Sequence, residues 1–117
     1  MPIKKITAII DELQWVKVEK ALELHGVTGF TVQAVKGRGN YCNTYSENHL
    51  VDHTQIVIYT GDQHARRIAT LIMQTADVGA ESEGLIEITS VDELFWVYEQ
   101  SLAVASEFKY FEVSRGE

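Results

Sequence analysis

Cysteine and proline are nearly absent from this chain of 117 residues, which contains one of each, Cys42 and Pro2. A lone cysteine cannot form an internal disulfide, which excludes a disulfide-stapled secreted scaffold and is typical of a reducing compartment. No apolar run approaches the roughly 18 residues that a membrane helix needs, and Ile6–Ile10 is too short for the core of a secretory signal. We therefore expect a cytoplasmic protein that does not insert into a membrane.

Basic residues are also scarce. Ten lysines and arginines oppose 17 aspartates and glutamates, and the formal net charge is −7. No cluster of basic residues is dense enough to follow a phosphate backbone, so we expect no nucleic-acid partner. A small anion bound by this chain would have to be held by local geometry, against an unfavourable overall field.

Apolar residues make up 45% of the chain, which is enough for one hydrophobic core, and the length suits a single domain over residues 1–117. Period-two alternation predicts four strands, and apolar stripes at helical spacing predict two helices. In chain order these elements are Ile3–Ile10 (strand), Asp11–Gly26 (helix), Thr28–Gly37 (strand), His53–Thr60 (strand), Asp62–Asp77 (helix) and Leu85–Val91 (strand). The order β-α-β-β-α-β predicts an α+β, ferredoxin-like fold with an antiparallel sheet.

The pattern after Asp92 is ambiguous, since residues 92–108 suit a helix and residues 107–114 suit a final short strand. Two helices are enough to cover one face of a four-stranded sheet. The other face keeps apolar groups, and an exposed apolar face of that size is usually an interaction surface. We therefore expect a closed homo-oligomer that buries this face. Its apolar residues are Ile3, Ile9, Val35, Val57 and Tyr59.

Glycines bound two loops of the predicted fold. Gly29 precedes the second strand and Gly37 and Gly39 follow it, while residues 79–84 begin and end with glycine. Glycine lets the backbone approach a ligand closely and expose its N–H groups to an anion. The Thr31 hydroxyl and the Arg38 charge could add to such a site. An ordinary strand end with a hairpin loop stays open as an alternative, because one G-x-G is a weak signal.

The segments "HGVTGFTVQAVKGRGNY" (His25–Tyr41) and "DVGAESEGLIEI" (Asp77–Ile88), in this order of elements, resemble the PII signalling proteins. The likeness spans about residues 3–98. It implies a homotrimer of ferredoxin-like subunits that binds adenine nucleotides in clefts between neighbours, without enzymatic activity. Its most specific part is a G-x-x-G-F-T-V element followed by G-x-G, made of Gly26, Gly29, Phe30, Thr31, Val32, Gly37 and Gly39.

The resemblance also assigns roles to residues. Gly29, Phe30 and Thr31 would border the adenine, and Gly37, Arg38 and Gly39 would meet the ribose and phosphates. Residues 40–51 would be the T-loop, a short effector arm that docks onto a target protein, and residues 99–117 would form a C-terminal extension. The far side of the cleft would be closed by Ser82, Glu83, Gly84 and Leu85.

Departures from the classical PII pattern concern charge. Leu85 stands where classical members have a lysine, and Trp96 and Tyr98 align with two arginines. Because charge-assisted bonds hold a triphosphate, their loss favours AMP or ADP over ATP. Tyr41 replaces the glutamine that helps to hold magnesium and 2-oxoglutarate.

The pattern looks more like the PII-like branch linked to inorganic carbon, including its carboxysome-associated members. That likeness implies bicarbonate as a candidate co-ligand, and a bicarbonate transporter or carboxysome-related protein as a candidate target. The candidate bicarbonate donors are Arg38, Asn40 and Tyr41.

Three alternatives stay open: a nitrogen-regulating PII protein, a slow nucleotide hydrolase using the same cleft, and a divalent-cation-binding ferredoxin-like trimer. The last would bind metal through Cys42, His49 and His53. The i, i+4 spacing of the two histidines converges only on a helix, whereas His53 begins a predicted strand. No serine has a nucleophile-elbow pattern and no acid–base pair is evident, so we expect no catalytic residues, no metal site and no resident cofactor.

Overall fold

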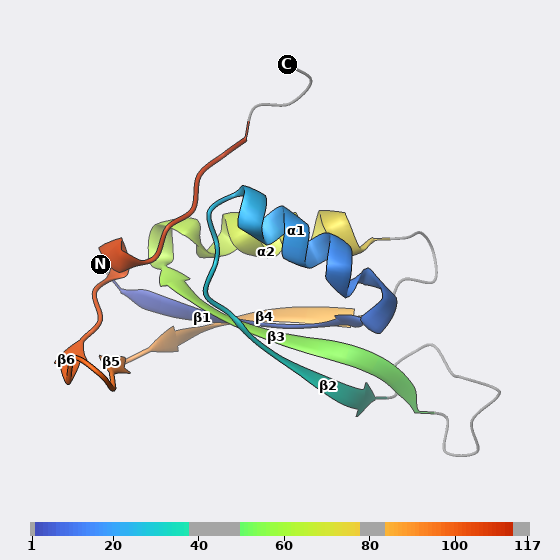
Figure 1. Cartoon of the computed structure of the whole chain (residues 1–117), viewed down its shortest axis with the longest axis horizontal. Coiled ribbons are helices and arrows are strands. Elements are labelled where there is room, and N and C mark those ends of the chain that lie inside the picture. Colours follow the sequence, from blue (N-terminus) through green and yellow to red (C-terminus); the bar gives the residue numbers. More distant parts are fainter. Residues whose placement is uncertain (1, 38–49, 78–83, 114–117) are drawn as a thin grey trace.

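The computed structural model describes residues 2–37, 50–77 and 84–113. It has the predicted order of elements, followed by a small hairpin and a 3-10 turn (Figure 1). The elements are β1 (Ile3–Asp11), η1 (Glu12–Gln14), α1 (Trp15–Leu24), β2 (Thr31–Gly37), β3 (Val51–Gly61), α2 (Asp62–Ala76), β4 (Gly84–Val91), β5 (Phe95–Trp96), β6 (Ser101–Leu102) and η2 (Ala105–Glu107).

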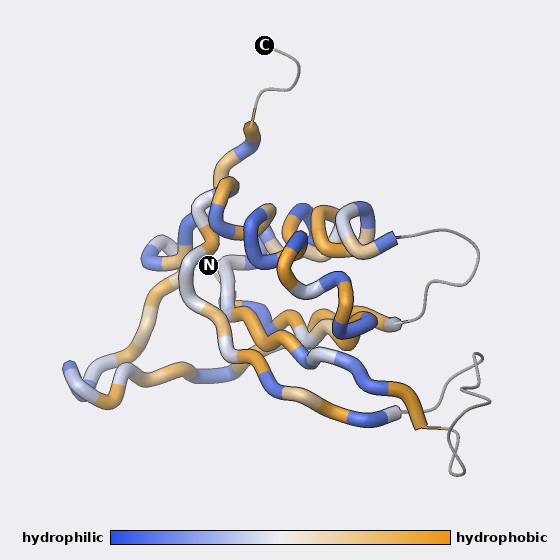
Figure 2. The backbone as a smooth tube through the Cα atoms, turned by 45° about the vertical axis from the view of Figure 1, so that its right-hand side comes forward, coloured by the Kyte–Doolittle hydropathy of each residue, from blue (hydrophilic) through white to orange (hydrophobic). Residues whose placement is uncertain are grey.

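The four long strands form one antiparallel sheet in the order β2-β3-β1-β4, and both helices lie on the same face of it (Figure 1). In the centre, Ile6 of β1 lies opposite Ile58 of β3 and Ile88 of β4. This register turns the even-numbered residues of β1 and β3 toward the helices. The alternation of apolar and polar residues along the strands is visible in Figure 2. The predicted α+β, ferredoxin-like architecture is confirmed.

The helices bury the stripes that their periodicity predicts. Val18 and Leu22 of α1 are fully buried, as are Ile68 and Ile72 of α2. The first helix begins later than expected, because residues 12–14 form a 3-10 turn capped by Asp11, whose carboxylate accepts the Leu13 N–H at 3.0 Å. Of the described helices, neither α1 nor α2 is long and apolar enough to cross a membrane.

The second strand is shorter than its sequence pattern suggests. Gly26 ends the first helical segment with φ +89°, and Val27 N–H still donates to Leu22 O at 2.9 Å. The chain then joins the sheet only at Thr31, which lies opposite Val57 of β3. Because β3 continues to Gly61, its last residues extend past the start of β2.

The C-terminal segment, residues 101–113, is neither the helix nor the sheet strand that the sequence suggests; both expectations are wrong. After η2 it runs in an extended path past the end of α1 (Figure 1). The Phe111 N–H donates to His25 O at 2.9 Å, and His25 Nδ1 lies 2.8 Å from Phe111 O. The Tyr110 ring stacks on His25 at 5.4 Å. The segment therefore pairs with the helix end instead of a sheet edge.

The C-terminal segment also covers part of the sheet face that faces away from the helices. Ile3 is only 8% exposed, because it packs in a second core cluster with Ala103 and Ala105. The expectation that apolar residues on this face are exposed is therefore wrong at Ile3. Ile9 and Val57 on the same face are half-buried, so they keep part of their surface exposed. Residues packed around the second cluster are Tyr59, Val91, Leu94, Trp96 and Phe108.

The packing at Gly26 predicts a specific loss of stability. A Cβ at this position would lie 2.5 Å from Phe111 Cε2, and φ +89° disfavours any L side chain. We expect Gly26→Ala to lower the free energy of unfolding by about 1–3 kcal/mol, and to loosen the contact between Phe111 and His25. The measurement is denaturant unfolding at one fixed protein concentration.

Gly29→Ala is the matched control, since a Cβ there would meet nothing within 4 Å. We expect this variant to unfold within about 0.5 kcal/mol of the wild type. Equal stability of the two variants would contradict the role given to Gly26.

Candidate functional site

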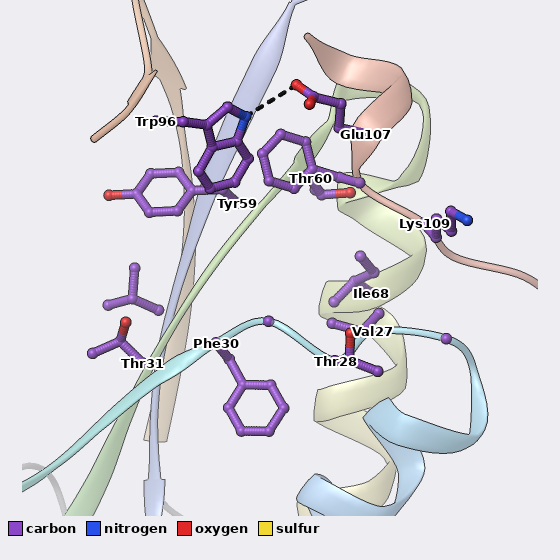
Figure 3. Close-up of a pocket in the computed structure, with 14 residues that line it drawn as sticks. Val27, Thr28, Phe30, Thr31, Tyr59, Thr60, Ile68, Trp96, Glu107 and Lys109 are labelled. Atoms are coloured by element: carbon purple, nitrogen blue, oxygen red, sulfur yellow. Dashed lines mark hydrogen bonds between the residues drawn. The ribbon is translucent and has the colours of Figure 1, made fainter. Parts of the chain in front are cut away.

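A cavity of about 490 Å³ lies at the corner of the fold where β2 starts (Figure 3). This volume falls within the range of small-molecule sites. Its walls come from the segment that links α1 to β2, from β3 and α2, and from the C-terminal part of the chain. The lining residues are Gly26, Val27, Thr28, Gly29, Phe30, Thr31, Val57, Tyr59, Thr60, Ile68, Trp96, Glu107, Phe108 and Lys109.

The register of the sheet produces this cavity. Since β2 pairs with β3 only from Thr31 opposite Val57, Tyr59 and Thr60 lie beyond the paired region on that side. On its other side β3 remains paired with β1 as far as Gly61, so the strand keeps its path. A notch is left between the end of β3 and the backbone of residues 26–30. We refer to it below as the β2 cleft.

One wall of the β2 cleft is aromatic and is fixed by hydrogen bonds. The rings of Trp96 and Phe108 lie 5.7 Å apart at an angle of 32°. The Trp96 indole N–H donates to Glu107 Oε1 at 3.1 Å (Figure 3). The Val104 N–H donates to the same oxygen at 2.7 Å. These two donors favour the ionised carboxylate and hold the pKa of Glu107 below its ordinary value, the Val104 bond contributing most.

Several of the residues that line the cleft carry polar side chains. Thr28 and Thr31 are exposed, and Thr60 has a buried hydroxyl without a hydrogen-bond partner among the described residues. Lys109, exposed at the rim, is the cationic side chain that the described part of the chain contributes to the lining. Such a mixture suits a ligand with a flat apolar part and a small number of polar groups.

The predicted site residues do not all meet at this cleft. Gly29, Phe30 and Thr31 line it, whereas Gly84 and Leu85 line a separate groove of about 310 Å³ between β4 and the end of α2. Gly37 lines neither. The remaining predicted residues lie outside the described part of the chain: Arg38, Gly39, Asn40, Tyr41, Ser82 and Glu83, with residues 40–49 of the expected T-loop.

Distance explains why one chain cannot unite the predicted halves. The strand from Thr31 to Gly37 spans six residue steps, which is roughly 20 Å. Gly37 pairs with Val51, and Gly84 pairs with Ile10, so both lie toward the same end of the sheet. Gly37 and Gly84 therefore share an end of the sheet, and the β2 cleft lies far from both.

The fold requires glycine at some of these positions and not at others. Gly84 has φ +142° and abuts the Ile9 carbonyl, so the fold itself requires glycine there. Among the described residues, a Cβ on Gly29 would meet nothing within 4 Å, and one on Gly37 would meet only His53 Nδ1, at 4.0 Å. Packing among these residues therefore leaves space beside Gly29 and Gly37.

The metal alternative rests on three residues, of which Cys42 and His49 lie outside the described part. His53 is 5% exposed, and its Nδ1 lies 2.9 Å from Val51 O. Within residues 2–37, 50–77 and 84–113, no group of three or more His, Cys, Asp or Glu side chains could hold a metal ion. The described geometry gives this alternative no support.

Sequence reasoning missed most of the aromatic wall. Trp96 stands out in the sequence as the replacement of an arginine and as an aromatic residue that could stack on a base, with packing in the core or at an interface as the preferred interpretation. Glu107, Phe108 and Lys109 lie in a segment whose local pattern suggested other structures. Contacts distant in sequence, such as Phe111 with His25, bring them to the cleft.

Comparisons with known proteins identify the family. The model of the family "Nitrogen regulatory protein P-II" matches residues 3–100. Nitrogen regulatory protein P-II 2 of Methanothermobacter thermautotrophicus is 32% identical over 99 residues, covering 79% of this chain and 86% of that protein. Nitrogen regulatory protein P-II of Porphyra purpurea is 29% identical over 111 residues, covering 89% and 99%.

A solved structure agrees in fold. PII of Arabidopsis thaliana, bound to citrate, superposes with a TM-score of 0.76 at 22% identity, covering 87% of this chain and 89% of that one. The family match extends over most of the sequence and over all four strands of the main sheet. The chain therefore belongs to the PII family of regulatory proteins.

Proposed function

We propose that this protein is a homotrimeric sensor that binds AMP or ADP in clefts between protomers. In each cleft, the β2 cleft of one protomer would hold the base. The end of the sheet that carries Gly37, Gly84 and Leu85 in its neighbour would hold the ribose and phosphates. Two observations carry this proposal. The two halves are separated along β2, and the described residues leave space beside Gly29 and Gly37.

Charge favours a short phosphate chain. Leu85 is 59% exposed at the position where classical family members have a lysine, and Trp96 and Tyr98 occupy the positions aligned with arginines. A triphosphate carries more negative charge than these positions can offset in a chain of net charge −7. Lys109 at the rim offers one cation, which suits a mono- or diphosphate better.

Residues 38–50 connect β2 to β3, and the T-loop expected at residues 40–51 falls in this connection except for Val51, which begins β3. Contact of a phosphate with Gly37, Arg38 and Gly39 would bias the conformation of this T-loop, which would then present a different surface to a target protein. We place the sensor in the cytoplasm and in inorganic-carbon metabolism. Bicarbonate bound by Arg38, Asn40 and Tyr41 is the proposed co-ligand, and a bicarbonate transporter or carboxysome-related protein is the proposed target.

A nitrogen-regulating role is the second candidate, because the matched family and the relatives above carry that description. Such a protein would prefer ATP and bind it together with 2-oxoglutarate. The loss of cations at Leu85, Trp96 and Tyr98 is the reason to rank it second.

Thermal unfolding with ligands tests the proposal. A ligand at 100 times its dissociation constant stabilises the folded state by about 2.7 kcal/mol per site, which raises the melting temperature by several degrees. We expect AMP or ADP to give larger shifts than ATP or cyclic AMP, and bicarbonate to increase them. The absence of any shift with all four nucleotides would contradict nucleotide sensing, while ATP synergy with 2-oxoglutarate would favour the nitrogen role.

Gly37→Val tests the phosphate half. A branched side chain would occupy the space beside Gly37, so we expect the ADP shift to be lost while the trimer remains intact by light scattering. Val35→Ile, two residues earlier on the same strand and on the same face of the sheet, is the control and should bind ADP normally. Unchanged ADP binding by Gly37→Val would mean that the phosphate half lies elsewhere.

Mixed oligomers test whether the two halves come from different protomers. Gly29→Val obstructs the base half and Gly37→Val the phosphate half, so neither variant alone should bind ADP. In trimers reassembled from equal amounts of both, about one quarter of the clefts would combine two intact halves. Isothermal titration should then recover about one quarter of the wild-type ADP stoichiometry, whereas a site within one chain would recover none.

A further inference from the structure

The aromatic wall of the β2 cleft comes in part from residues that the family match does not include. The match ends at residue 100, whereas Glu107, Phe108 and Lys109 follow it and Trp96 lies only just within it. This part of the lining is therefore a feature of this chain to be explained from its own contacts.

The wall is held on both sides by hydrogen bonds. In the hairpin that carries Trp96, the Ala103 N–H donates to Leu94 O at 2.7 Å and closes the β5–β6 pair. After it, the Phe111 N–H donates to His25 O. Between these points, Glu107 accepts the indole N–H of Trp96 and so fixes the plane of that ring. The two rings thus have a set orientation before any ligand arrives.

The position of Trp96 and Phe108 determines which part of a bound ligand they can contact. Trp96 lies in the upper part of the view of the cleft, and Val27, Thr28 and Phe30 lie below it (Figure 3). Phe108 lines the cleft beside Trp96. Trp96 is half-buried, so part of its ring stays accessible from the cleft. A flat apolar group that enters the cleft would lie between an aromatic surface and the backbone around Gly29.

We propose that Trp96 and Phe108 form the base-binding wall of the cleft, and that Glu107 acts as the positioning residue for the indole. This inference rests on the proposed function and names the residues that recognise the base. Every nucleobase has a π face, so stacking provides affinity for a flat ring, while the hydroxyls of Thr28 and Thr31 and the nearby backbone provide polar contacts. The C-terminal segment is thereby a part of the ligand site.

Packing is the competing explanation, since Trp96 and Phe108 also adjoin the second core cluster. A packing role predicts that substitution lowers stability without a selective effect on ligands that carry a base. Stacking predicts a loss of affinity that depends on the aromatic ring and is the same for adenosine and for AMP, because both contain the base.

The test compares Trp96→Leu with Trp96→Phe in the full-length protein, using isothermal titration with adenosine and AMP. Trp96→Leu should weaken both ligands by the same factor, about tenfold, while Trp96→Phe should stay within about threefold of the wild type because it keeps a ring. Phe95→Leu is the matched control. It changes the neighbouring aromatic residue of β5, which is exposed and does not line the cleft, and should bind as the wild type does.

A second measurement uses no variant of the wall. In Trp15→Phe, Trp96 is the sole tryptophan, and AMP should quench its fluorescence if the base stacks on it. Circular dichroism confirms that each variant is folded, and if Trp96→Leu fails to fold, the fluorescence result decides. Unquenched Trp96 at saturating AMP contradicts the proposal.

The outcomes separate the two proposals. Normal AMP binding by Trp96→Leu overturns the proposal that the wall binds the base and leaves the proposed function intact. Equal losses in Trp96→Leu and Trp96→Phe also overturn it, because the affinity would then not depend on an aromatic ring at position 96. If the wild-type protein binds none of the four nucleotides, the proposed function is wrong, and the proposed role of the wall, which depends on it, is wrong as well.

Discussion

The pairing of Thr31 with Val57 fixes the geometry of the candidate site. It sets where β2 enters the sheet, and because β3 continues to Gly61, it leaves the β2 cleft beside Tyr59 and Thr60. The same register carries Gly37 to the far end of the strand, opposite Val51. A site that needs both ends of β2 must therefore be completed by another molecule, which is why the proposed nucleotide site lies between protomers.

The main elements could be predicted from local pattern because each has one apolar face with a clear partner. Val18 and Leu22 recur at helical spacing, and Ile56 and Ile58 alternate as a half-covered strand requires. The C-terminal segment could not be predicted in this way. Its contacts, such as Phe111 with His25, join residues far apart in sequence, and its alternating aromatics face different partners instead of one sheet.

The candidate site was predictable only in part, for a similar reason. Gly29, Phe30 and Thr31 belong to a short motif and indeed line the cleft. Gly84 belongs to the same predicted set, yet its positive φ and its contact with the Ile9 carbonyl already account for glycine at that position. Phe108 carries no motif, and only the fold brings it beside Trp96. A glycine that the fold requires is therefore no evidence of a ligand site, whereas a glycine that the fold does not require can be.

The central claim is that one ligand spans two protomers, with its base against one chain and its phosphate against the next. A crystal structure of the protein with ADP tests this most directly. The account predicts the adenine beside Gly29, Thr31 and Trp96 of one protomer and the phosphates at Gly37 of its neighbour. A nucleotide held entirely by one chain, or bound outside the β2 cleft, would contradict it.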